Sequence, residues 1–258
     1  MPSPAPSAAP DPLRPFLRPE TMRIRPLRAL QAFGRLMRDK EDTSQVFQIT
    51  SALAGRSAAK GYRRMLRDPE GARQAYLAGE FVDRLRDAAW LAQFPDDSVG
   101  GAYRAFLTRN GFDPDGLVAI SAQGSNPPLP HPRAWYSRRL RDIHDIWHVL
   151  TGYDTDALGE ACLVAFSYAQ TGSLGFAAIG LGAARVIERE DRGVPALKAV
   201  LEGWRNGRRA AWLPALDYEA LFAEPLEHAR ARLGIRAPAV YASVPEPRRR
   251  ALTLRAAA

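Results

Sequence analysis

The sequence predicts an all-α protein, organised as a single multi-helix domain around a central uncharged helix. Three observations support this class. Apolar residues recur at helical spacing, no segment alternates apolar and polar residues as a half-buried strand does, and no Asn-Gly hairpin signal joins two alternating runs. A chain of 258 residues can also bury a substantial core without disulfides. We expect about nine helices from the segments that show helical periodicity.

Composition divides the chain into four regions. Residues 1–12 are rich in Pro, Ala and Ser and lack the basic and apolar blocks of a secretory signal, so we expect a disordered tail there. Residues 13–40 are strongly basic and amphipathic. Residues 41–240 make up the helical domain, and residues 241–258 form a basic C-terminal tail.

The basic segment at 13–40 contains seven arginines. Its apolar residues recur at helical spacing, at Leu27, Leu30, Phe33 and Leu36. A basic amphipathic helix of this kind lies on an anionic membrane surface, or it packs on its own domain with a solvated basic face. The sequence alone supports both interpretations.

The net charge of +8 comes mainly from arginine. Such a balance suits nucleic acid, an anionic membrane surface or an acidic substrate, although a coding preference for arginine accounts for the excess equally well. We expect no nucleic-acid partner, because the arginines do not alternate with aromatic residues in any recognised module. The one cysteine, Cys162, excludes an intrachain disulfide and a cysteine-built zinc site, and its apolar surroundings predict a small core residue.

Start and stop signals place the helices along the chain. Pro69 follows Asp68 and predicts the start of a helix. The Pro and Gly content of residues 91–100 predicts a loop, and the prolines of residues 126–132 exclude helix and predict a rigid loop rather than a domain linker.

Two further helices are bounded on both sides. Ser98 can cap a helix over Val99–Asn110, and Ser137 can cap a helix that runs from about Arg138 to Thr151. Each of these helices is expected to end at the glycine that follows it.

The second of these helices carries His144, Asp145 and His148. Because an α-helix turns about 100° per residue, the three side chains fall within an arc of about 100°. Two imidazoles at this spacing with a nearby carboxylate are what a divalent cation takes from one helix. Asp156 can cap the next helix, which places Glu160 in its first turn, and a hairpin between the helices returns that carboxylate toward the histidines.

These four side chains are therefore the candidate metal ligands and the candidate working centre. Mixed imidazole and carboxylate ligands suit Zn²⁺, Fe²⁺ or Mn²⁺ better than Ca²⁺. Isolated His-x-x-x-His pairs are nevertheless common on helices, and most of them bind no metal. The chain has only four histidines, and we expect the other two, His131 and His228, in a loop and on an exposed helix face.

Residues 161–184 contain no charged side chain. The stretch is long enough to span a bilayer, but its four glycines, with Gln170 and Ser173, make insertion weak. Small residues let another backbone, or a long apolar ligand, approach closely. We favour one central helix that lies beside the metal site and lines an apolar cavity, with plain core packing as the alternative.

The string His144-Asp-x-x-His148, followed by Glu160, resembles the motif of the ubiquinone (coenzyme Q) biosynthesis family of the fourth Coq protein. The words around it are similar too, with His-Val-Leu-Thr-Gly after Trp147. Further similar segments are Gly101-Ala-Tyr-Arg-Ala-Phe, Asn110-Gly-Phe-Asp-Pro-Asp, Trp204-x-x-Gly207, Leu216-Asp-Tyr-Glu and Leu233-Gly-Ile235. The resemblance covers residues 42–236 and neither tail.

This resemblance implies an all-helical fold and a bound divalent metal, usually zinc, held by His144, Asp145, His148 and Glu160. It implies a lyase-type decarboxylase that acts on a 4-hydroxy-3-methoxy-5-polyprenylbenzoate, removes the ring carboxyl and installs a hydroxyl at ring carbon 1. Residues 41–240 would then be a catalytic and lipid-binding domain. The compact basic N-terminus, without organelle targeting, suggests a bacterial member that is cytoplasmic and peripheral on the inner face of the inner membrane. We also expect a homodimer and contacts with other quinone-biosynthesis enzymes.

Two other functions fit parts of the sequence. A non-catalytic scaffold would bind the isoprenoid lipid and organise other quinone-biosynthesis enzymes. A metal phosphohydrolase is suggested by the bare His-Asp doublet, but such enzymes usually need further His and Asp ligands. Arg141, one turn before His144, could receive an anionic group or be an ordinary surface arginine.

Overall fold

The computed structural model describes residues 24–36, 43–53, 55–112 and 132–252. Across these ranges the chain forms helices and no strand, so the predicted all-α class is confirmed. The helices in chain order are α1 Pro26–Leu36, α2 Thr43–Leu53, α3 Ser57–Met65, α4 Pro69–Leu77, α5 Phe81–Arg86, α6 Ala88–Ala92, α7 Val99–Asn110, α9 Pro132–Asp142, α10 His144–Thr151, α11 Ala157–Thr171, α12 Leu174–Glu190, α13 Ala196–Arg209, η3 Leu213–Ala215, α14 Tyr218–Phe222, α15 Leu226–Arg232, α16 Ala239–Ala242 and α17 Glu246–Ala251.

More helices occur in the described ranges than the sequence predicts. Several of them, such as α5, α6 and α14, have only five or six residues. A segment that short completes too few turns for a helical period to show in the sequence. The expected tail at 1–12, the proline-rich loop before Pro132 and His131 all lie outside the described residues.

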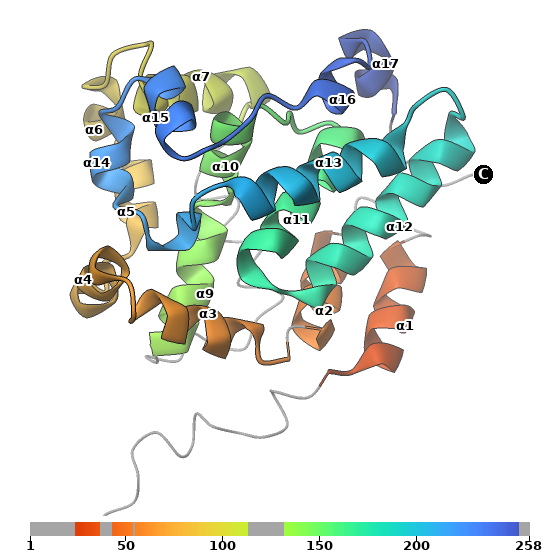
Figure 1. Ribbon diagram of the computed structural model, residues 1–258, viewed down its shortest axis with the longest axis horizontal. Coiled ribbons are helices and arrows are strands. Elements are labelled where there is room, and N and C mark those ends of the chain that lie inside the picture. The colour runs from red at the N-terminus through yellow and green to blue at the C-terminus, as the bar shows by residue number, and fades with distance from the viewer. Residues whose placement is uncertain (1–23, 37–42, 54, 113–131, 253–258) are drawn as a thin grey trace, which may run out of the picture.

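Helices α11, α12 and α13 form the centre of the molecule and lie side by side (Figure 1). The uncharged stretch 161–184, predicted as one helix, is divided between α11 and α12. The division occurs at Gly172, which has a positive φ of 69° and ends α11. Because glycine adopts this left-handed conformation without steric cost, the chain reverses there and α12 returns along α11.

Glycines bring these three helices into close contact. A Cβ added at Gly203 or Gly207 of α13 would lie 2.5 Å from the carbonyl oxygen of Cys162 or 2.6 Å from that of Phe166, both on α11. At Gly180 of α12 it would lie 3.2 Å from another carbonyl of α11. Gly180, one of the glycines that weaken a membrane span, thus serves helix–helix packing. In the described part of the chain, no helix combines the length and the apolar character needed to cross a bilayer.

Helices α1 and α2 pack together, and α2 in turn lies against α12 (Figure 1). Among the residues of α1 whose burial is described, Ala29 and Ala32 are buried, whereas Leu27, predicted on its apolar face, is 75% exposed. The basic helix therefore packs on its own domain through a face that includes Ala29 and Ala32. Its Leu27 side faces solvent.

The predicted start of α4 at Pro69 and the predicted cap of α7 are confirmed. The carboxylate of Asp68 accepts the N–H of Gly71 at 2.9 Å, and the hydroxyl of Ser98 accepts the N–H of Gly101 at 3.0 Å. Each side chain satisfies one of the backbone donors that a helix leaves open at its start. Gly111 ends α7 with a positive φ of 62°.

Ser137, in contrast, does not cap a helix. It lies inside α9, which begins at Pro132, since proline suits the first helical turn. A single residue outside the helices, Ile143, separates α9 from α10, and its N–H still bonds the carbonyl of Arg139 at 3.1 Å. The segment predicted as a single helix therefore forms two consecutive helices separated by one residue. The second of them, α10, begins at His144.

The helical region continues past the expected boundary at residue 240, which falls within α16. Tyr241, Val244 and Leu252 are buried in the main hydrophobic core. Residues 241–252 therefore belong to the domain, because their apolar side chains are covered by it. The remainder of the expected tail, 253–258, lies outside the described residues.

The close approach of α11 and α13 can be tested with Gly203→Ala. The added methyl group would overlap a backbone carbonyl, which cannot move aside as a flexible side chain can. We expect the free energy of unfolding to fall by about 2–3 kcal/mol, as overpacking in a rigid core does. Urea denaturation followed by circular dichroism measures this value.

Gly34→Ala in α1 is the matched control, because a Cβ at Gly34 meets no atom within 4 Å. Replacing an exposed helical glycine by alanine should stabilise the protein by about 0.5–1 kcal/mol. Equal changes in the two variants would contradict the packing described for α13.

Candidate metal centre

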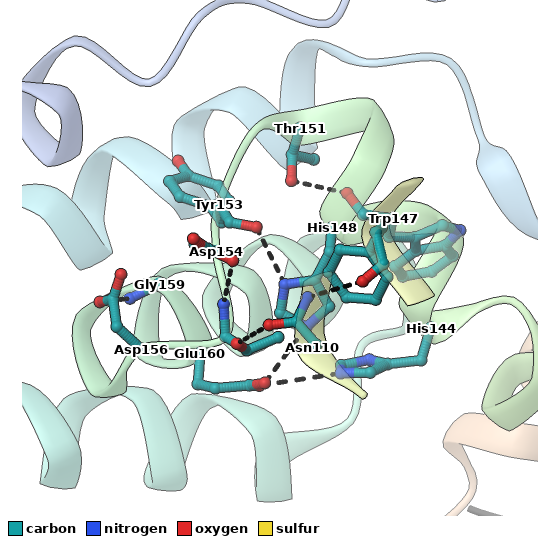
Figure 2. A network of polar contacts seen from close by, with 12 residues as sticks. Asn110, His144, Trp147, His148, Thr151, Tyr153, Asp154, Asp156, Gly159 and Glu160 are labelled. Carbon is teal, nitrogen blue, oxygen red and sulfur yellow. Dashed lines mark hydrogen bonds and ion pairs between the residues drawn. The ribbon is translucent and has the colours of Figure 1, made fainter. Parts of the chain in front are cut away.

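The turn between α10 and α11 brings the two motif segments face to face. Gly152 ends α10 with a positive φ of 77°, and Asp156 begins α11 by accepting the N–H groups of Leu158 and Gly159 at 3.1 and 2.9 Å. Glu160 consequently lies in the first turn of α11, as predicted. Because the connecting turn is short, Glu160 faces the histidines of α10 (Figure 2).

The structure brings the predicted ligands together. His144, Asp145 and His148 each offer a ligand atom, and these three atoms lie within 4.8 Å of one another. Glu160 faces both imidazoles, with Oε1 at 3.2 Å from Nε2 of His148 and Oε2 at 3.8 Å from Nε2 of His144 (Figure 2). Two nitrogens and carboxylate oxygens from two helices thus converge on one place.

A backbone carbonyl fixes the orientation of His148. The carbonyl oxygen of Tyr153 lies 3.0 Å from Nδ1 of His148. Since a carbonyl oxygen only accepts, Nδ1 carries a proton, and Nε2 is left as the ring nitrogen that faces Glu160 and can bind a metal once it is deprotonated. Histidines that bind metals are commonly held by such a bond from the second ring nitrogen. His148 is therefore set in the tautomer and direction of a metal ligand.

Burial differs across the site. The ring of Phe106 stacks on His148, with ring centroids 5.5 Å apart at an interplanar angle of 22°. The side chain of His148 is 1% exposed, that of His144 27% and that of Glu160 42%. The site therefore has a closed side at His148 and an open side at Glu160, through which a ligand can enter.

The site electrostatically favours a positive charge. Burial disfavours the ionised form of Asp145 and raises its pKa. Partial removal of Glu160 from water also acts to raise its pKa, but the two histidines outweigh this effect and lower the pKa of Glu160. Burial opposes the protonation of His148, yet Glu160 outweighs it and raises the pKa of His148. Because a metal ligand must be deprotonated, a cation bound here would replace the proton of His148.

The donor set also fits a divalent ion in its spacing. Two ligand atoms on a tetrahedral zinc ion are about 3.4 Å apart, given bond lengths near 2.0–2.1 Å. The distances of 3.2 and 3.8 Å from Glu160 to the imidazoles of His148 and His144 lie on either side of that value. Imidazole with carboxylate is the chemistry of Zn²⁺, Fe²⁺ and Mn²⁺ sites.

The C-terminal helices support the helix that carries Glu160. The hydroxyl of Tyr241 donates to Oδ2 of Asp156 at 2.5 Å, and Nε of Arg249 lies 3.4 Å from the same oxygen. Tyr241 also accepts the N–H of Asp154 at 3.1 Å. The residue that caps α11 is thus itself held by α16 and α17.

Sequence reasoning did not identify Tyr153, Phe106 or Tyr241. The contribution of Tyr153 is a backbone carbonyl, which carries no residue-type signal. Phe106 and Tyr241 come from α7 and α16, so only the tertiary structure brings them to the site. The similar segment that ends at Phe106 was the one available signal, and it did not indicate a role.

Three other residues that were singled out from the sequence can be placed in the structure. Arg141 forms an ion pair with the buried Asp142, at 2.6 Å between Nη2 and Oδ1, so the guanidinium compensates a buried carboxylate. His228 lies on α15 with its side chain 68% exposed, as predicted. Cys162 is a fully buried free thiol, which confirms a small core residue.

Comparison with known proteins identifies the family. The family profile described as coenzyme Q (ubiquinone) biosynthesis protein Coq4 matches residues 22–239. The chain belongs to the Coq4 family. The ubiquinone biosynthesis protein COQ4 homolog, mitochondrial, of Homo sapiens is 33% identical over 185 residues, which cover 69% of this chain and 65% of the human protein. The corresponding protein of Bos taurus is 32% identical over 199 residues, which cover 74% of this chain and 70% of the bovine protein.

A solved structure supports the fold of this Coq4-family chain. The crystal structure of a candidate ubiquinone biosynthesis protein from Nostoc punctiforme matches with a TM-score of 0.60 at 21% identity. The match covers 83% of this chain and all of that one. At this identity the likeness shows the shared fold.

The metal centre can be tested by metal analysis. Protein equilibrated with zinc and passed through gel filtration should retain about one ion per chain. His148→Ala and Glu160→Gln should retain far less, because each removes a donor that faces the site. Elemental mass spectrometry measures the content.

His228→Ala is the matched control, since it also removes an imidazole but from an exposed helix face. If His148→Ala retains as much zinc as His228→Ala, the four residues do not form a metal site.

The support of α11 by the C-terminal helices can be tested with Tyr241→Phe. The variant removes a hydroxyl that donates to Asp156 and accepts from Asp154, both partly buried. We expect the free energy of unfolding to fall by about 1–3 kcal/mol, the range for a lost buried hydrogen bond. Tyr76→Phe, at an exposed tyrosine of α4, should change it little. A Tyr241→Phe protein as stable as Tyr76→Phe would show that the contact contributes nothing.

Proposed function

We propose that the protein acts in ubiquinone biosynthesis as a metal-dependent decarboxylase. Its substrate would be a polyprenylated hydroxybenzoate, of the 4-hydroxy-3-methoxy-5-polyprenylbenzoate type. The reaction would be an oxidative decarboxylation, in which the ring carboxyl leaves as CO₂, a hydroxyl is installed at ring carbon 1, and dioxygen accepts the two electrons that this exchange releases. The observation that carries this proposal is the convergence of His144, Asp145, His148 and Glu160 in a chain of the Coq4 family.

The four side chains would hold the metal, with zinc as the first choice and iron or manganese as alternatives. A divalent ion there supplies a Lewis acid for a carboxylate or phenolate oxygen. The chain's own part is positioning: the Tyr153 carbonyl sets the direction of the His148 ring, and Phe106 excludes water from that side. The exposed side at Glu160 leaves room for the aromatic head group.

The neighbouring helices supply apolar surface for an isoprenoid tail. Gly180 of α12 lies against the carbonyl of Ala161, the residue after Glu160. The next residue, Leu181, is exposed, as is Leu174 two turns earlier on α12. An amphiphile with its head at Glu160 could lay its tail along α12. We expected an apolar cavity along one central helix. The tail is instead placed along the exposed side of α12, because α12 and α13 cover α11.

A non-catalytic role as an isoprenoid-binding scaffold for other quinone-biosynthesis enzymes is the second candidate. The observation that favours it is the surface of α1, where Leu27, Arg28 and Arg35 are exposed, together with the exposed Ile24 just before the helix. Such a surface suits peripheral contact with an anionic membrane, here proposed as the cytoplasmic face of a bacterial inner membrane. A homodimer would present two such surfaces to the same bilayer.

The enzymatic proposal is tested in a bacterial strain that lacks its own copy of this protein. Complementation with His148→Ala should leave ubiquinone at least about tenfold below the level with wild-type protein. A carboxylated polyprenyl precursor should accumulate, because the ligand set is broken. Lipid extracts analysed by mass spectrometry measure both species, and His228→Ala serves as the control.

Ubiquinone at the wild-type level, with no carboxylated intermediate in the His148→Ala strain, would rule the reaction out. Purified zinc-loaded protein separates the two candidates. Turnover of the benzoate without other proteins supports the enzyme. Absence of turnover, with loss of the other quinone enzymes from the membrane in a strain without the protein, supports the scaffold.

A further inference from the structure

A second candidate site lies on α13, apart from the metal centre. A cleft of about 630 Å³ opens between α13 and the segment that leads into α16. None of its lining residues is among the four candidate ligands. The volume is in the range of small-molecule sites, about 300–1,000 Å³.

The cleft is strongly cationic. Its exposed charged side chains are Lys198, Arg205, Arg209 and Arg236. Within the described ranges, none of these four has a hydrogen-bonding or ion-pairing partner for its charged group. Most other arginines of this protein that line a helix surface contact a carboxylate, as Arg232 contacts Glu224 at 2.6 Å. Four cations without a partner around one cleft therefore favour the binding of an anionic ligand.

The one acidic residue of the cleft is already engaged. A carboxylate oxygen of Glu202 accepts the backbone N–H of Val240 at 2.8 Å. This bond ties α13 to the start of α16 and holds the two walls of the cleft together. Glu202 therefore shapes the cleft and leaves the positive charge largely uncompensated.

The arrangement of the cations suits phosphate. Arg205 and Arg209 are four residues apart on α13, so they lie on the same face of the helix, and Lys198 lies two turns before Arg205. Guanidinium groups present paired donors that match phosphate oxygens, and such charge-assisted bonds are the strong ones. Arg236 adds a cation from the opposite wall.

Apart from Asn206, the rest of the lining is apolar. Leu201 on α13 faces the cleft, and Ala239 and Val240 contribute from the other wall. We propose that this cleft binds a phosphate or diphosphate group carried on a partly apolar molecule. No aromatic side chain lines it on which bases could stack, and its cations surround one hollow instead of following a stripe, so a nucleic-acid strand does not fit.

Two sources can supply this chemistry, the head group of an anionic phospholipid and a soluble organic phosphate. The first probe is inorganic pyrophosphate, titrated into the purified full-length protein by calorimetry. The second is a pair of vesicle preparations, phosphatidylcholine with and without phosphatidylglycerol, followed by co-sedimentation. The test variant is the double substitution Arg205→Gln with Arg209→Gln.

The matched control is Arg67→Gln with Arg192→Gln, which removes the same charge from exposed positions outside the cleft. We expect the cleft variant to bind at least one probe about tenfold more weakly than wild type and the control to bind it within about twofold. A cleft-dependent loss for pyrophosphate alone assigns a soluble phosphate. A cleft-dependent loss for phosphatidylglycerol vesicles alone assigns a lipid head group. Both outcomes support the proposal.

Two outcomes overturn it. One is that wild-type protein binds neither probe. The other is that the cleft variant and the control bind both probes equally well. Because all four substituted side chains are exposed, both proteins should fold, and equal melting temperatures by circular dichroism confirm that any loss of binding is local.

Discussion

Helix α11 is enclosed by its neighbours along most of its length, because ten of its fifteen residues are buried and both α12 and α13 reach its backbone through glycines. An ionised side chain in the middle of such a helix would lose its hydration without gaining a partner. The polar side chains of α11 therefore matter most near its two ends. At the first turn Glu160 faces two imidazoles, and near the last turn Gln170 meets α13 and η3.

Gln170 shows how completely a polar group must be bonded in this core. Its side-chain nitrogen donates to the carbonyls of Gly207 and Ala211 at 2.7 and 3.1 Å, and its side-chain oxygen accepts the N–H of Leu213 at 2.9 Å. One amide thus satisfies three backbone groups where α13 ends. The same helix is anchored by hydrogen bonds at its far end and by Asp156 at its start, so the position of Glu160 is determined at both ends.

Local sequence signals predicted the structure correctly wherever the residues of one segment determine its conformation. The caps Ser98 and Asp156 were predicted correctly, and helical spacing was enough to bring His144 and His148 onto one face. Long-range contacts were not available to such reasoning. The position of residues 241–252 and the contacts of Phe106 and Tyr241 at the site depend on which distant element supplies the partner, and periodicity contains no information about that. The division at Gly172 and the Tyr153 carbonyl that orients His148 are local, but a glycine also occurs inside helices and a backbone carbonyl carries no residue-type signal.

The bond between Tyr241 and the cap of α11 links two parts of the chain that are synthesised at different times. On the ribosome, α10 and α11 emerge well before α16 and α17, so the N-terminus of α11 at first lacks the hydroxyl and guanidinium that later contact Asp156. The ligand cluster acquires its final support only when nearly the whole domain has been translated. The candidate site is thereby completed late in the synthesis of each molecule, and a chain that stops short of α16 carries the four candidate ligands without their final support.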